Sequence, residues 1–577
     1  MDFRIGPWLV RSSLNCIVRD GRVHSVTPRS MDVLVFLANR HGEVCSKREI
    51  FEVVWRGAFV TDDALTRCIG ELRRVFGETG QQASILVTVA KRGYRIAPAV
   101  TPEPANTLAP QWGGSSARAR SMVVLPLLNL SGDPGQEYFS DGMTEILTSN
   151  LSKVGSLRVI SRTSAMTYKG SPKQLREIAG ELNVELVVEG SVVRSGRRVR
   201  IVAQLIDAAT DTHLWTETFD RNWEDVLSLQ AELAEAIVRN VSVVVTPEEK
   251  ARLTYGPRIR SQAYEAYLKG TFHLNKSTPE GFRLGLAYLE QAVADDPSDP
   301  FAHASLALGF AIMGHERFPD ASLKAKAAAL RSLTLGGPVA EAVAALGMAE
   351  LYWDWDLDAA GRDLERALEL KPNFAEVLRN YSWYLRLRGR PREALSVMRQ
   401  AQQLEPLVPL FSADLAWQCY EEGEWEEALL EAAKSIELDP DFAEGLAVAG
   451  WVLTEQGRIE EALPFHRRAA ADPSWKWPLG RTLALMGQPD EAKKIAAQLQ
   501  DSPGPMEHWG LAVVYSALGE NDLAFHWLET AYRSRFSWMP WLSDFSLRPL
   551  DLFTPLRDHP QFLEMIAKVG IPTRNHC

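Results

Sequence analysis

The stretch VTDDALTRCIGELRRVFGE, residues 60–78, decides the fold of the first part of the chain. Its apolar side chains return at helical spacing, which predicts one amphipathic helix that begins near the N-cap residues Thr61 and Asp62. The side chains expected to face a core are Leu65, Cys68, Ile69, Leu72 and Phe76. The opposite face carries Asp63, Thr66, Arg67, Gly70 and Arg74, with Arg73 at its edge. Arginine and threonine on the outer face of a helix suit the major groove of DNA, where they contact bases or phosphates.

The sequence on both sides of this helix predicts the rest of a DNA-binding domain. Residues 28–40 place apolar side chains on one side of a first helix, and Ser46 and Glu49 form a capping box that opens a second. Residues 85–89 and 91–96 predict a hairpin with basic residues at its tip. Exposed arginines on an isolated helix usually do no more than solvate it. The two preceding helices and the basic hairpin favour DNA binding instead.

Three segments carry a resemblance to a known family: TPRSMDVLVFLANRHGEVCSKREIFEVVW, VTDDALTRCIGELRRVFGE and TVAKRGYRI. Together they closely resemble the winged-helix effector domain of OmpR/PhoB-type regulators, in the CadC/ToxR-like branch that lacks a phosphorylated receiver domain. The resemblance covers residues 1–98 and implies several N-terminal strands. These strands are expected within Phe3–Val10, Leu14–Arg19 and Arg22–Val26.

The resemblance also implies which residues contact DNA. The expected contacts are Thr66, Arg67 and Arg74 to bases or nearby backbone in the major groove, Arg73 to a phosphate, and Lys91 and Arg92 from the wing near the minor groove. Gly70 and Glu71 stand where relatives often carry arginine, which thins the positive face. About four phosphate contacts would give a salt slope of only about −3 to −4. We therefore expect specificity to need two copies on repeated half-sites, through self-association or a partner.

Composition and charge set the wider frame. The 577 residues are too many for one core, and 46% hydrophobic with 24% charged residues is typical of globular proteins. The net charge is −11, but residues 1–100 carry +5 and the remaining residues carry −16. We therefore expect any contact with nucleic acid to be confined to residues 1–100. Neither the five cysteines nor the eleven histidines show metal-ligand spacing. With no signal sequence or membrane span in view, we expect a cytoplasmic protein without metal or membrane contact.

The predicted organisation is multidomain. An α+β winged helix is expected over residues 1–100 and a Pro-, Ala-, Gly- and Ser-rich linker over 101–120. An α/β domain is expected over residues 121–255. An all-α tetratricopeptide solenoid follows over residues 262–550, with a C-terminal cap or tail over 551–577.

The middle domain resembles the TolB-N/FlgO-like domain in VLPLLNLSGDPGQEYFSDGMTEILTSNL and VVEGSVVRSGRRVRIVAQLIDAATDTHLWTETFDR. In that family the domain often sits between a signalling module, which is a nucleotide cyclase in some members, and tetratricopeptide repeats. Ser140 and Asp141 are expected to cap a helix that runs to about Leu151. Four carboxylates gather near this helix: Asp133, Glu137, Asp141 and Glu145. These carboxylates could form a ligand site. Asp133 and Asp141 are explained equally by roles in a turn and a helix cap, which favours a structural interpretation.

The C-terminal half repeats with a period of 34 residues, shared by four residue types. The repeating positions are Pro372, Pro406, Pro440 and Pro473; Gly389, Gly423 and Gly457; Ala360, Ala394, Ala428 and Ala462; and Trp383, Trp417 and Trp451. This is the period of a tetratricopeptide helix pair, with glycine at the turn, alanine where the helices approach, and proline after the second helix. Weaker copies extend the array to about seven or eight units.

The first helix of each repeat normally lines the concave surface of such a solenoid. Trp383, Trp417 and Trp451 are then expected to form a hydrophobic track for a peptide or partner helix, with Arg379 and Arg386 pointing into the same groove. The alternative is that these tryptophans pack between the helices of the solenoid. The sequence leaves both interpretations open.

The preferred function is a one-component transcription regulator that binds double-stranded promoter DNA and needs no cofactor. Its repeats would bind a protein partner or signal and control self-association. The alternative is a tetratricopeptide scaffold whose winged helix contacts proteins rather than DNA. An enzyme is not expected, because no Walker A sequence, nucleophile elbow, dinucleotide fingerprint or other catalytic constellation occurs.

Overall fold

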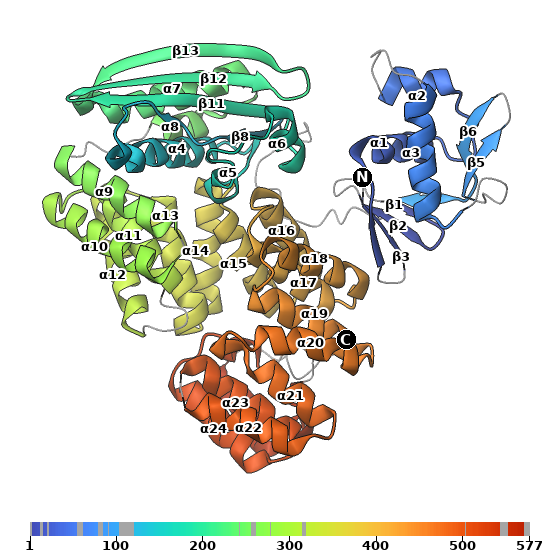
Figure 1. Cartoon of the computed structure of the whole chain (residues 1–577). Coiled ribbons are helices and arrows are strands. Elements are labelled where there is room, and N and C mark those ends of the chain that lie inside the picture. The colour runs from blue at the N-terminus through green and yellow to red at the C-terminus, as the bar shows by residue number, and fades with distance from the viewer. Residues whose placement is uncertain are drawn as a thin grey trace. The chain divides into compact units, whose positions relative to one another are not determined.

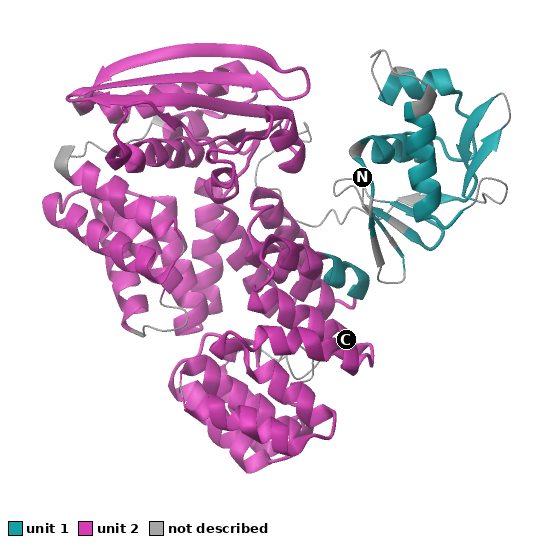
Figure 2. Cartoon of the chain, viewed as in Figure 1, with its two compact units in different colours: residues 1–107, 424–430 teal, residues 108–423, 431–577 magenta. Residues whose placement is uncertain are grey.

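The structure is a computed structural model, and it describes residues 3–11, 16–19, 22–54, 62–78, 85–89, 92–102, 120–241, 243–254, 261–276, 278–313, 319–501, 504–542 and 552–570. The chain divides into two compact units (Figure 1 and Figure 2). One contains residues 1–107 with 424–430, and the other contains residues 108–423 with 431–577. Within the described ranges, no helix combines the length and the apolar character needed to cross a bilayer.

An antiparallel sheet opens the N-terminal domain, with the strand order β4-β3-β2-β1-β7. Its strands are β1 (Phe3–Ile5), β2 (Trp8–Arg11), β3 (Cys16–Arg19), β4 (Arg22–Ser25) and β7 (Val100–Pro102). Ile5, Val10 and Ile17 are fully buried in the domain core. Because β7 pairs with β1, with Phe3 opposite Pro102, the first residues of the predicted linker belong to this sheet.

Three helices and a hairpin complete the domain. They are α1 (Pro28–Ala38), α2 (Lys47–Val54), α3 (Asp62–Val75), β5 (Leu86–Val89) and β6 (Gly93–Ile96). The capping box of α2 is present, since the Ser46 N–H donates to Glu49 Oε2 at 2.8 Å and the Glu49 N–H donates to Ser46 Oγ at 3.3 Å. Figure 1 shows α3 running between α1 and the hairpin. The five residues of α3 that were expected to face the core are all buried.

Gly93 allows the hairpin to approach the loop before α2. Its φ is +137°, and a Cβ at this position would lie 1.9 Å from the carbonyl oxygen of Cys45. Cys45 and Tyr94 exchange two backbone hydrogen bonds of 2.9 Å each. The KRGYR segment therefore needs glycine where the two backbones meet.

The middle domain is built on a mixed sheet with the order β10-β8-β11-β12-β13, and β9 pairs beside β11. The strands are β8 (Arg120–Val124), β9 (Leu128–Asn129), β10 (Leu157–Val159), β11 (Leu186–Ser195), β12 (Arg198–Asp207) and β13 (Thr212–Asn222). Strands β10, β8 and β11 run parallel, whereas β11, β12 and β13 form an antiparallel meander. Met122 and Val124 pack on one face and Val123 on the other, so helices are needed on both faces.

Helices cover both faces of this mixed sheet. One face carries α4 (Glu137–Leu151), α7 (Val226–Val241) and α8 (Pro247–Thr254), and the other carries α5 (Arg162–Met166) and α6 (Leu175–Glu181).

The predicted start of α4 is wrong. The helix begins at Glu137, directly after a 3-10 turn, η2 (Pro134–Gln136). Asp133 caps that turn, because its Oδ1 accepts the Gly135 N–H at 2.8 Å. Pro134 and Asp133 thus start the helical path earlier than expected. Ser140 and Asp141 consequently lie inside the helix and are buried rather than capping it.

Helices fill the remainder of the described chain (Figure 1). They are α9 (Ser261–Leu274), α10 (Pro279–Asp295), α11 (Pro300–Met313), α12 (Pro319–Gly336), α13 (Ala340–Ala349), the π-helix η4 (Glu350–Asp354), α14 (Leu357–Leu370), α15 (Ala375–Leu387), α16 (Pro391–Leu404), α17 (Pro409–Glu421), α18 (Trp425–Leu438), α19 (Ala443–Glu455), α20 (Ile459–Ala469), η5 (Pro473–Trp475), α21 (Trp477–Leu485), α22 (Pro489–Gln500), α23 (Pro505–Ala517), α24 (Asn521–Arg533), η6 (Met539–Trp541), η8 (Thr554–Leu556) and α25 (Pro560–Val569). Successive helices pack as pairs, for example α15 with α16 and α19 with α20.

The period of 34 residues has the expected structural basis. Gly389, Gly423 and Gly457 have φ of +74°, +77° and +74°, so each turn uses a conformation that glycine adopts without strain. The four periodic alanines are fully buried. Pro372, Pro406 and Pro440 each stand two residues after the end of a helix. The repeats therefore form helix pairs of the tetratricopeptide kind.

Candidate nucleic-acid interface and partner cavity

The outer face of α3 presents the predicted base-contacting residues. Thr66, Arg67 and Arg74 are exposed, while the other face of the same helix lies in the domain core. Lys91 and the side chain of Asp63 lie outside the described part of the structure. Arg92 is exposed beside the hairpin turn, which its backbone N–H closes by donating to the Val89 carbonyl at 2.9 Å. Because Arg67, Arg74 and Arg92 are exposed, they can meet a polyanion while the domain stays folded.

Arg73 has a second role that the sequence did not reveal. Its Nη2 donates to the Leu86 carbonyl at 2.8 Å and to Thr88 Oγ1 at 2.7 Å, and its Nε lies 3.3 Å from the same carbonyl. The guanidinium therefore fastens the hairpin to the end of α3. The phosphate contact implied by the family resemblance remains a prediction.

Glu71 clamps α3 to the start of α1. Its carboxylate accepts the Thr27 N–H at 3.0 Å, the Thr27 hydroxyl at 2.8 Å and the Ser30 hydroxyl. Burial alone would raise the pKa of Glu71, but the hydrogen bonds from Ser30 and Thr27 outweigh it and lower the pKa. Glu71 stands where relatives often carry arginine, and here it ties the third helix to the start of α1. Its partners lie about forty residues away, so local spacing could not have found them.

A small domain with these three helices, a β-hairpin wing and arginines on its third helix belongs to the winged-helix class of DNA-binding domains. Residues 21–96 match the family model described as "Transcriptional regulatory protein, C terminal", so the N-terminal domain is of the OmpR/PhoB type. Residues 375–400 match a tetratricopeptide repeat model.

Three relatives show how far the likeness extends. The transcriptional activator CadC of Escherichia coli (strain K12) is 40% identical over 94 residues, which are 16% of this chain and 18% of CadC. The transcriptional regulator HilA of Salmonella typhimurium is 24% identical over 412 residues, 70% of this chain and 71% of HilA. A Rhizobium meliloti protein described as an adenylate cyclase is 38% identical over 188 residues, 33% of this chain and 32% of that protein. The chain thus spans about a third of the cyclase relative and under a fifth of CadC.

The structure divides the three periodic tryptophans: Trp383 and Trp417 line a cavity, whereas Trp451 is not part of its lining. Trp383, Trp417 and Trp451 are 8%, 3% and 1% exposed, and adjacent rings meet edge to face at 5.7 and 4.9 Å. Trp541 lies 6.0 Å from Trp383, and Trp538 lies 5.2 Å from Trp417. The segment after α24 therefore covers the tryptophan ladder with rings of its own. Its distance along the chain hid this contact from the repeat pattern.

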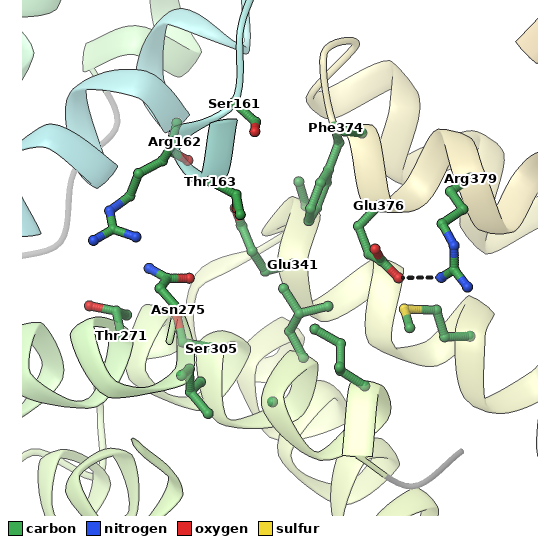
Figure 3. Close-up of a pocket in the computed structure, with 18 of the residues that line it drawn as sticks. Ser161, Arg162, Thr163, Thr271, Asn275, Ser305, Glu341, Phe374, Glu376 and Arg379 are labelled. Atoms are coloured by element: carbon green, nitrogen blue, oxygen red, sulfur yellow. Dashed lines mark hydrogen bonds and ion pairs between the residues drawn. The ribbon is translucent and has the colours of Figure 1, made fainter. Parts of the chain in front are cut away.

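The two arginines assigned to the groove behave differently from each other. Arg386 does not face a groove, because its side chain is fully buried and pairs with Glu421 and Glu422 at the end of α17. Arg379 lines a cavity. Its Nε lies 2.5 Å from Asp414 Oδ2 and its Nη1 3.0 Å from Glu376 Oε1 (Figure 3). Burial alone would lower the pKa of Arg379. The neighbouring carboxylates of Asp414 and Glu376 outweigh this effect, so the net shift is upward and the guanidinium stays charged.

The cavity is large and has two walls. Its volume is about 2230 Å³. Its lining comes from helices α9 to α15, α17 and α19, from Trp475, Trp538 and Trp541, and from parts of α4, α5, α7 and α8 in the middle domain. Figure 3 shows Arg162 of α5 facing Asn275 and Thr271, with Glu376 and Arg379 on the far side. The middle domain and the repeats thus build one cavity, a feature that the sequence did not predict.

Hydrogen bonds fix the middle domain to the repeats beside this cavity. Asn373 Nδ2 donates to the Leu157 carbonyl at 2.8 Å, and the Ser161 N–H donates to the Leu404 carbonyl at 2.9 Å. Ser164 Oγ donates to Glu405 Oε2 at 2.9 Å. Burial raises the pKa of Glu405 to about 7 although serine hydroxyls lower it. A carboxyl that titrates near neutral pH therefore sits at the junction.

The four carboxylates near α4 have structural partners. Lys169 Nζ lies 2.6 Å from both Glu137 and Asp141, and Arg162 lies 3.7 Å from Asp141 and 3.6 Å from Glu145. The hydrogen bond from Lys169 lowers the pKa of Glu137. With Asp133 capping its turn, the geometry favours the structural interpretation of this cluster.

Proposed function

We propose that this chain is a one-component transcription regulator of the cytoplasm, whose winged helix binds promoter DNA. The observation that carries the proposal is the separation of faces on α3. Arg67, Arg74 and Thr66 are exposed, while the opposite side chains anchor the helix in the core of an OmpR/PhoB-type domain. The described relatives CadC and HilA are regulators of transcription by name, which supports the same conclusion.

In this proposal α3 enters the major groove with Thr66, Arg67 and Arg74, while Lys91 and Arg92 on the wing meet the adjacent backbone. Glu71 and Arg73 hold α3 against α1 and the hairpin, so the reading surface is rigid before DNA arrives. Two copies on repeated half-sites would supply the specificity that one thinly charged domain lacks.

Arg67→Ala tests the recognition helix in the intact protein. Footprinting across the genome identifies the sites, and gel-shift titrations then compare affinities at one salt concentration. Loss of one base contact should weaken specific binding by about 10- to 100-fold. Arg467→Ala, which removes an exposed arginine from α20, is the matched control and should bind as the unmodified protein does. Specific binding retained by Arg67→Ala would contradict this assignment.

We further propose that the repeats and the middle domain bind a protein partner or signal rather than catalyse a reaction. The shared cavity of about 2230 Å³ supports this role. The same cavity also favours the alternative of a scaffold whose winged helix contacts protein. A chain that binds promoter DNA no better at low salt than an acidic control protein would favour the scaffold.

A further inference from the structure

The wall of the cavity formed by the repeats is acidic. Among the described lining residues from 376 to 541, Arg379 is the one cationic side chain. Six carboxylates besides the junction residue Glu405 line the same wall: Glu376, Asp414, Asp439, Asp441, Glu444 and Asp472. Arg379 pairs with Glu376 and Asp414, so its charge is already engaged within the wall. This end of the cavity repels anions and attracts cations.

The same wall is aromatic. The rings that line it are Tyr352, Trp383, Trp417, Trp475, Trp538 and Trp541, of which Trp475 and Trp538 are half-buried and the others are buried. Ring faces attract ammonium and guanidinium groups, most strongly in the case of tryptophan and where water is excluded. Carboxylates beside tryptophans therefore fit a cation that also brings apolar surface, such as the side chain of lysine or arginine.

The opposite wall has a different character. Its charges are nearly balanced, because Lys153, Arg162, Arg252, Arg283, Lys324 and Lys371 line it together with Glu145, Glu248, Glu290, Asp320 and Glu341. Arg162 pairs with Glu145, and Lys371 pairs with Glu341. Figure 3 shows Arg162 and Asn275 across the cavity from Glu376. The excess of carboxylates therefore lies on the wall between Glu376 and Asp472, and a cationic ligand is drawn to that wall.

The size of the cavity selects among cationic ligands. Sites for small molecules usually measure about 300–1,000 Å³, whereas this cavity measures about 2230 Å³. A free amine would leave most of that volume to water, while an extended peptide fills it. We propose that the cavity binds a lysine- or arginine-containing segment of a partner protein, with the basic side chains against the acidic, tryptophan-lined wall. This inference rests on the proposed partner-binding role of the repeats.

The test uses the intact protein and a fluorescein-labelled peptide of about ten residues that alternates alanine and lysine, with an alanine–glutamate peptide beside it. Anisotropy should report binding of the lysine peptide only. Glu444→Gln combined with Asp441→Asn removes two lining charges and should weaken binding about tenfold. Glu437→Gln combined with Glu460→Gln removes two exposed charges outside the lining and should leave binding unchanged.

Several outcomes would overturn the proposal. Equal losses in the two double variants would mean that the acidic surface, not the cavity, attracts the peptide. Equal binding of the glutamate peptide, or no binding of either peptide, would remove the charge preference. Displacement of the lysine peptide by equimolar spermine would identify a small-amine site instead. Arg67→Ala separates this proposal from the DNA-binding one, because that variant should lose promoter binding and keep the lysine peptide.

Discussion

Helices α3 and α17 have nearly the same length, 14 and 13 residues, but they meet their surroundings in opposite ways. α3 buries an aliphatic stripe and leaves Arg67 and Arg74 exposed. Every residue of α17 from Phe411 to Glu421 is buried, and the Trp417 ring packs against Trp538 from the segment after α24. The difference teaches that a charged face stays exposed at the surface of a small domain, whereas in the repeats the aromatic side chains pack against one another and only some of them reach the cavity.

Trp417→Ala tests this contrast with the largest expected effect. Trp417 contacts Trp383, Trp451 and Trp538, so its loss opens a cavity in the ladder. We expect the free energy of unfolding of the repeats to fall by about 3–5 kcal/mol in denaturant titrations followed by helical circular dichroism. Leu485→Ala, at a side chain that is 45% exposed, should cost less than about 0.5 kcal/mol. A Trp417→Ala variant as stable as Leu485→Ala would mean that the ladder is not core.

The same contrast explains how much the sequence could predict. The helices, the wing and the 34-residue period follow from local spacing, turn glycines and caps, because those signals act within one or two helical turns. The face of Trp417 follows from the same period, but its burial depends on Trp538, far along the chain. The environment of Arg386 could not be predicted for the same reason, because its ion-pair partners Glu421 and Glu422 belong to the next repeat. The side chains that share one face of a helix can be predicted from local spacing, but the distant residues that pack against that face cannot.

Two glutamates extend the comparison to electrostatics. Glu71 in the N-terminal domain and Glu405 between the middle domain and the repeats both accept hydrogen bonds from serine hydroxyls and join separate elements. Their pKa values move in opposite directions. Burial dominates at Glu405 and raises its pKa to about 7, while hydrogen bonds to the partly exposed Glu71 lower its pKa.

Glu405→Gln should weaken the pH dependence of the free energy of unfolding of the middle domain and the repeats. A carboxyl with a raised folded-state pKa binds its proton more tightly when folded, so its contribution to stability is full below the unfolded value of 4.5 and is lost as the pH rises towards about 7. We expect the unmodified chain to lose about 1–3 kcal/mol across that window, and Glu405→Gln to lose correspondingly less in parallel denaturant titrations. Glu437→Gln, an exposed carboxyl on α18, should keep the original slope. An unchanged slope in Glu405→Gln would assign the dependence to other groups.

Glu71→Gln should have the smallest effect and the opposite pH signature. The amide keeps one acceptor oxygen but loses the charge that Thr27 and Ser30 stabilise, so we expect a loss of about 1–2 kcal/mol near neutral pH. A lowered folded-state pKa means that the clamp stabilises the domain fully above the unfolded value of 4.5 and fails as the pH falls through the folded one. The variant should therefore lose part of the acid sensitivity of the unmodified domain, whereas the exposed-site control Glu43→Gln should keep it. Because the clamp also orients α3, DNA affinity should fall with stability in Glu71→Gln, and a variant that loses stability but keeps its affinity would show that Glu71 supports the fold without aiming the recognition helix.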